Sequence, residues 1–139
     1  MEDRYLFNGK RLDNGEWVQG ALFNGESHCI IGQEIKFSPY TEHECKIVGY
    51  EVDRDTICQC TGLKDKNGKM IWENDILVGY LDDMYPENAT YAQVIWDKNG
   101  FYTKEQYSDD ISLMDEFDEK HFEVCGNIFD NPELLESEE

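Results

Sequence analysis

The chain has 139 residues, 40% of them hydrophobic, which is enough to bury a core without metal or disulfide staples. Its formal net charge is −19, from 31 acids and 12 bases. A field of this sign repels DNA, RNA and anionic membranes, so we expect neither direct nucleic-acid binding nor membrane binding.

Asn-Gly pairs are the clearest local signal along the chain. Type I′ hairpin turns need positive φ at both central residues, and asparagine and glycine tolerate that conformation best. Five such pairs occur, at residues 8–9, 14–15, 24–25, 67–68 and 99–100. Between these pairs lie short runs rich in aromatic and β-branched residues, which favour strands. The predicted strands are residues 5–7, 17–23, 29–31, 46–52, 56–60, 75–80, 91–96, 101–106 and 122–125.

Little helix is expected, and it lies near the C-terminus. Ile111, Met114 and Phe117 fall close to one face of a short helix predicted within residues 108–120. Asn131 followed by Pro132 indicates a cap and a first helical turn.

These elements predict a mainly β fold, that is, α+β with little helix. The architecture we expect is an antiparallel meander or SH3-like small barrel, with one or two short helices near the C-terminus. The length fits a single domain over residues 1–135. Residues 136–139 are expected to form a frayed acidic tail, in a region where residues 105–139 hold 13 acids and one base.

The five cysteines are an odd number, and the chain opens on charged residues rather than on an apolar signal segment. No run approaches the roughly 20 apolar residues that span a bilayer. We therefore expect a cytoplasmic protein with reduced thiols. The cysteines are Cys29, Cys45, Cys58, Cys60 and Cys125.

Cys58 and Cys60 are the first candidates for a metal site. In a strand, residues two apart point to the same face, so the two thiols are expected to be neighbours. Zinc sites usually contain two C-x₂₋₄-C or H-x₃₋₅-H pairs, and no second pair follows. Small apolar side chains lining a core are the competing reading. A second, irregular set combines His28 and Cys29 with His43 and Cys45.

No catalytic motif is present: the sequence has no G-x-S-x-G, P-loop or G-x-G-x-x-G pattern. We therefore predict no catalytic residue and no cofactor. Abundant carboxylates leave open a metal-dependent hydrolase or nuclease, for which Asp65, Asp75 and Asp97 are the acids to test.

The best-defined segment is residues 56–78, which ends in TGLKDKNGKMIWENDILV. Its residues predict a strand, a D-K-N-G turn, a short antiparallel strand, a second tight turn over residues 73–75 and then another strand. This segment resembles the YopX family of phage and prophage proteins. The opening phrases FNGKR at residues 7–11 and NGEWVQG at residues 14–20 match as well, and so does the ending GNIFDNPELL at residues 126–135.

The resemblance implies a mainly β fold, a phage or prophage origin in a bacterial cell, and oligomerisation. It implies no activity and no catalytic residues. Asn74 stands where the family usually has glycine, and asparagine tolerates the positive φ that the turn needs. Cys125 stands where the family usually has an aliphatic residue. Cys58 and Cys60 lie in the segment before TGLKDKNG, which otherwise matches the family. These departures argue against a role for the thiols that the whole family shares.

Three functions remain open from the sequence. The first is a phage accessory protein that acts by protein binding or self-assembly, because strands at sheet edges offer unpaired backbone groups to another chain. Its partners are then a second copy or a host or phage protein. The second is an acidic nucleic-acid mimic that inhibits a host DNA-binding protein. The third is the metal-dependent hydrolase or nuclease.

Overall fold

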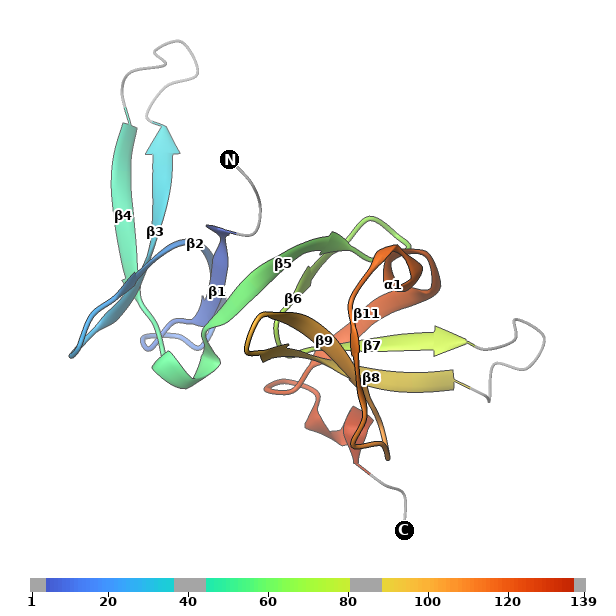
Figure 1. Cartoon of the computed structure of the whole chain (residues 1–139). Helices are drawn as coiled ribbons and strands as arrows, with labels where there is room; N and C mark the ends of the chain where they lie inside the picture. Colours follow the sequence, from blue (N-terminus) through green and yellow to red (C-terminus); the bar gives the residue numbers. More distant parts are fainter. Residues whose placement is uncertain (1–4, 37–44, 81–88, 137–139) are drawn as a thin grey trace. The chain divides into compact units, whose positions relative to one another are not determined.

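The computed structural model describes residues 5–36, 45–80 and 89–136, and its strands gather in two compact units (Figure 1). Unit 1 comprises Met1–Cys60 and unit 2 comprises Thr61–Glu139. The described strands form two antiparallel sheets with one α-helix, which confirms the mainly β prediction. Neither sheet closes into a barrel, so the SH3-like description fits only loosely. The single-domain expectation for residues 1–135 stays a prediction.

The sheet of unit 1 has β4 at one edge, followed in order by β3, β2 and β1, and β1 pairs on its other side with the first residues of β5. The strands are β1 (Phe7–Lys10), β2 (Trp17–Asn24), β3 (Cys29–Lys36), β4 (Cys45–Glu51) and β5 (Cys58–Lys64), with the 3₁₀ turn η2 (Arg54–Thr56) before β5. The core of this unit consists of Val18, Cys29, Ile31 and Val52.

Strand β2 changes partner halfway along. Its first half pairs with β1 and its second half, from Ala21, pairs with β3. At the change, a Cβ atom on Gly20 would overlap the carbonyl oxygen of Gly32, so glycine is required there.

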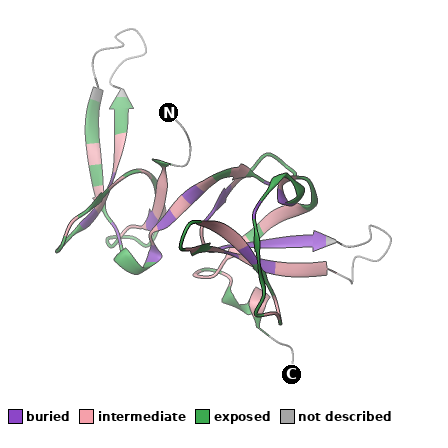
Figure 2. Ribbon diagram, in the orientation of Figure 1, coloured by how far each residue is buried: buried purple, intermediate pink, exposed green. Residues whose placement is uncertain are grey.

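Unit 2 contains the sheet β10-β9-β8-β7-β11, in which β7 is buried from Asp75 to Gly79 (Figure 2). The elements of this unit are β6 (Met70–Trp72), β7 (Asp75–Tyr80), β8 (Ala89–Asp97), β9 (Gly100–Glu105), β10 (Ile111–Leu113), α1 (Glu116–His121), β11 (Phe122–Asn127) and η4 (Pro132–Leu135). Its core consists of Ile71, Leu77, Val94 and Met114. None of the helices in the described ranges has the length and apolar character needed to cross a membrane.

The short helices near the C-terminus are confirmed, but the first is shorter than predicted. Helix α1 begins only at Glu116, where the Asp115 side chain accepts the backbone N–H of Phe117 in a capping box. Residues 111–113 instead form β10, because they pair with β9 at the edge of the sheet. The second helix is the 3₁₀ turn η4, with Asn131 at its N-cap and Pro132 in its first turn.

Four of the five Asn-Gly pairs lie at turns between consecutive strands, and the pair at residues 8–9 does not. Gly9 lies inside β1, where a Cβ atom would come within 3.1 Å of Ile31 and Val52. That glycine therefore allows close packing rather than a turn. Asn74 adopts φ 69° between β6 and β7, as the turn chemistry predicted.

Candidate functional site

Asp65 is a buried carboxylate whose two oxygens accept backbone N–H groups. Its Oδ1 accepts the N–H groups of Asn67 (2.9 Å) and Lys69 (2.8 Å), which shapes the turn between β5 and β6. Its Oδ2 accepts the N–H of Val124 in β11 (2.9 Å). Burial by itself raises the pKa of this carboxyl, but the three backbone N–H groups outweigh it and hold the pKa below 3.8.

Asp75, at the start of β7, is a second buried carboxyl with the opposite protonation behaviour. Its Oδ2 accepts the N–H of Trp72 at 2.8 Å across the Glu73-Asn74 turn. Burial raises its pKa to about 7; the Trp72 N–H and Lys69 lower that pKa, and the nearby charge of Asp65 raises it further. The two acids thus lie close enough for their charges to interact, and near pH 7 Asp65 is ionised while Asp75 is about half protonated.

The third predicted acid, Asp97, ends β8 at the turn into β9. Across residues 5–36, 45–80 and 89–136, no group of three or more His, Cys, Asp or Glu side chains is placed to hold a metal ion. The oxygens of Asp65 are used by backbone N–H groups. The structure therefore supplies no support for these three acids as joint metal ligands.

Cys58 and Cys60 are both buried, at alternate positions of β5, as the strand reading predicted. The Cys58 thiol donates to the carbonyl oxygen of Thr56 at 3.3 Å. A metal site at Cys58 and Cys60 stays a prediction.

In the second predicted metal set, the two described side chains, His28 and Cys29, each have another partner. Nδ1 of His28 lies 2.7 Å from Oε1 of Glu51, on the surface. The buried Cys29 thiol donates instead to Oδ1 of Asn24 at 3.2 Å. His43 and the side chain of Cys45 lie outside the described part of the chain.

An apolar hollow of about 820 Å³ opens on unit 1; we call it the unit 1 hollow. Its floor follows from the strand register, which aligns Ala21 of β2 with Gly32 of β3. Small residues in adjacent strands leave space above the sheet. Ile47 borders it and is 80% exposed. The lining residues are Tyr5, Leu6, Gln19, Gly20, Ala21, Gly32, Gln33, Glu34 and Ile47.

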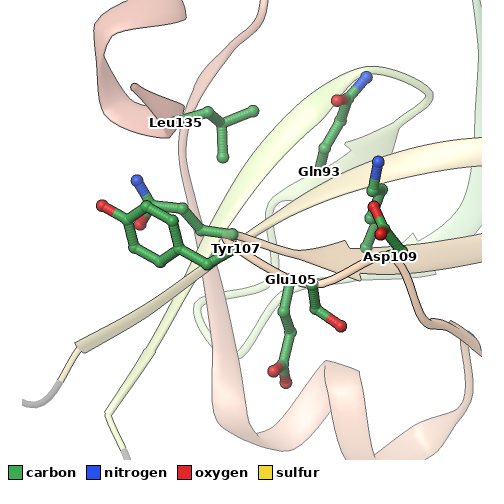
Figure 3. A pocket seen from close by; sticks show the side chains of 8 residues that line it. Gln93, Glu105, Tyr107, Asp109 and Leu135 are labelled. Carbon is green, nitrogen blue, oxygen red and sulfur yellow. The ribbon is translucent and has the colours of Figure 1, made fainter. Parts of the chain in front are cut away.

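A second cavity, of about 420 Å³, lies in unit 2 where β9 ends; we call it the unit 2 cavity. In the view of Figure 3, Tyr107 and Leu135 lie on one side of it, with Gln93 and Asp109 on the other. The remaining lining residues are Lys104, Glu105, Gln106 and Ser108.

Tyr107 is the unusual residue of this cavity. Its φ is +68° and its side chain is 78% exposed. Positive φ is uncommon for a bulky residue. Backbone hydrogen bonds of the two neighbouring residues hold this conformation. The N–H of Gln106 donates to the carbonyl oxygen of Tyr91 (2.8 Å), and the N–H of Ser108 donates to that of Glu105 (3.2 Å).

Sequence reasoning found neither surface. It treated glycine as a marker of turns, whereas Gly20, Gly32 and Gly49 lie inside strands, and glycine within a strand is the available signal for a close approach. Nothing in the sequence around Tyr107 indicates positive φ.

The family model described as YopX protein matches residues 7–136, which is nearly the whole chain. The structure is also similar to the crystal structure of protein EF1440 from Enterococcus faecalis, with a TM-score of 0.60 and 28% sequence identity. That similarity covers 94% of this chain and 96% of the other. A comparison with curated proteins finds no match.

We expect Asp65→Asn to destabilise the fold by about 1–3 kcal/mol. The asparagine amide has one acceptor oxygen where the carboxylate has two, so at least one of the N–H groups of Asn67, Lys69 and Val124 loses its partner. Urea unfolding followed by tryptophan fluorescence measures the change. Asp97→Asn is the matched control, and equal losses in the two variants would contradict the role given to Asp65.

Asp75 is expected to make stability fall with rising pH. Its folded pKa of about 7 lies above the ordinary 3.8, so between those values the folded chain holds a proton that the unfolded chain has released. The stability that Asp75 contributes in this way is complete below pH 3.8 and is lost as the pH rises to about 7. Above that pH it changes no further.

Asp75→Asn should remove that decline, since an amide stays neutral while its oxygen still accepts the Trp72 N–H. Between about pH 5 and about pH 8, the original chain should lose roughly 2–3 kcal/mol of unfolding free energy relative to the variant. Urea unfolding at both pH values tests this, and parallel pH profiles would refute it.

Proposed function

We propose that this chain, which belongs to the YopX family, works by binding protein rather than by catalysis, and that a second copy of the chain covers the unit 1 hollow. The phage or prophage origin and the cytoplasmic location expected from the sequence form part of this proposal. Supporting it, the buried carboxylates Asp65 and Asp75 of unit 2 accept backbone N–H groups, and unit 1 carries a large apolar surface opening.

The observation that carries the proposal is Ile47 at the border of the unit 1 hollow. A β-branched side chain that is 80% exposed gains nothing for the fold by being apolar, and burial of such a side chain stabilises by about 1.5–3 kcal/mol. The hollow beside it has room for an aliphatic side chain of another molecule. Exposed apolar area of this kind marks interaction sites.

A second copy fits because Ile47 lies on β4, the edge strand of the unit 1 sheet. Over the described residues, the sheet order gives β4 a strand neighbour on one side only, β3. In a two-fold dimer the same patch faces itself, so Ile47 of each copy enters the hollow of the other. Unit 1 carries 11 acids and 6 bases, a net charge of −5, which opposes this contact far less than the −14 of unit 2 would.

The acidic excess of unit 2 favours the alternative function, a nucleic-acid mimic directed at a basic host protein. Screened, non-specific attraction weakens steeply with salt. Binding of the chain to a basic DNA-binding protein that persists in about 0.3 M salt supports the mimic, and its loss in such salt removes it.

Light scattering coupled to size exclusion tests self-association across the widest attainable concentration range. We expect the full chain to reach twice its 16.3 kDa mass and Ile47→Glu to remain monomeric, because a buried unpaired carboxylate opposes the contact. Leu12→Glu is the matched control: Leu12 is 60% exposed in the same unit and does not line the hollow.

A strictly monomeric full chain, or an Ile47→Glu variant that associates as strongly as the original, contradicts a second copy on the hollow. Circular dichroism of each variant confirms that the strands have formed.

A further inference from the structure

A row of apolar side chains crosses the outer face of three strands in unit 2. Ile95 of β8 is opposite Tyr102 of β9, and Tyr102 is opposite Leu113 of β10, so the three side chains share one face. This face is opposite the one that buries Val94 and Thr103. Leu113 is 61% exposed, whereas Ile95 and Tyr102 are half-buried, so Leu113 offers the most apolar area of the row to another molecule. We call these three residues the outer apolar row.

The outer apolar row is continuous with the unit 2 cavity. The next aligned residues along the same strands and face are Gln93, Lys104 and Ile111. Gln93 and Lys104 also line the cavity. The apolar row and the cavity are therefore two parts of one surface.

The cavity offers groups that suit a cation. Two acids, Glu105 and Asp109, are among the residues that line it, against a single base, Lys104. Unit 2 as a whole holds 20 acids and 6 bases, a net charge of −14, so its field attracts positive groups. The exposed ring of Tyr107 adds an aromatic face, which attracts guanidinium and ammonium groups.

The backbone of Tyr107 shows that the fold has no need of its ring. The residue adopts φ +68°, a conformation that glycine takes without steric penalty. Hydrogen bonds of Gln106 and Ser108 hold the turn whatever the side chain at position 107. The ring is 78% exposed, so it contributes little to the core.

We propose that this surface binds a basic protein segment, which places an arginine or lysine side chain in the unit 2 cavity and an apolar side chain on the outer apolar row. Tyr102 of the row and Gln106 of the cavity lining are four residues apart along the chain, or about 13 Å where the chain is extended. An extended segment presents its anchors on one face at even spacings, so its two anchors are expected about four residues apart. This site lies in the other unit from the hollow and is independent of self-association.

The probe is an acetylated, amidated peptide of glycine, serine and threonine that carries one leucine and one arginine about four positions apart. Its control replaces arginine with citrulline, which keeps the shape and removes the charge. Both are titrated into the full, ¹⁵N-labelled chain. We expect the arginine peptide to shift the amide signals of residues 102–109, and the citrulline peptide to bind roughly threefold to tenfold more weakly.

Two variants separate binding from folding. Tyr107→Gly should weaken binding of the arginine peptide roughly threefold or more. The unfolding midpoint of this variant should equal that of the original chain or exceed it. Glu105→Gln combined with Asp109→Asn should weaken it similarly. The charge-matched control, Asp97→Asn combined with Glu116→Gln, removes two acids of unit 2 that do not line the cavity and should leave binding unchanged.

Three results overturn the proposal: signal shifts that do not map to residues 102–109, equal binding of the arginine and citrulline peptides, or equal losses in the cavity variant and its charge-matched control. Equal losses mean that the general charge of the unit, rather than this surface, attracts the peptide.

Discussion

The arrangement of unit 2 depends on one carboxylate that holds backbone from two distant segments. Asp65 accepts N–H groups from Asn67 and Lys69 in its own turn and from Val124 in β11, 59 residues along the chain. In the same place the Lys66 N–H donates to the carbonyl oxygen of Phe122. Burying a charge is costly unless such bonds compensate it, so this turn and this strand are specified together.

The same rule explains why two neighbouring acids titrate so differently. Asp65 has three N–H donors and remains ionised, whereas the carboxyl of Asp75 accepts the Trp72 N–H and has the charge of Asp65 nearby. With its surroundings buried and one acid already charged, Asp75 holds its proton to about pH 7. A raised pKa often marks a catalytic acid. Here burial accounts for the raised pKa, and the hydrogen bond from the Trp72 N–H, which lowers that pKa, gives Asp75 a structural role in closing the Glu73-Asn74 turn into β7.

The sequence predicted those parts of the fold that local chemistry determines. Turns at Asn14-Gly15 and Asn67-Gly68 follow from the conformational freedom of those residues, and the core strand β7 from its apolar run. It was wrong about residues 111–113, because only the free edge of β9 makes them a strand. It missed both surfaces for a similar reason: a pair of small residues such as Ala21 and Gly32 comes together only once the strands are in register.

The two surfaces differ in polarity and in the charge of the units that carry them, which is why we propose different partners for them. The unit 1 hollow is apolar and belongs to a unit of net charge −5, whereas the unit 2 cavity belongs to a unit of net charge −14. Two copies of the chain repel each other wherever their acidic units approach, so self-association favours unit 1. A basic segment is attracted by the field that excludes the second copy. On the two proposals made above, the uneven distribution of acids along the chain would direct a second copy to the unit 1 hollow and a basic segment to the unit 2 cavity.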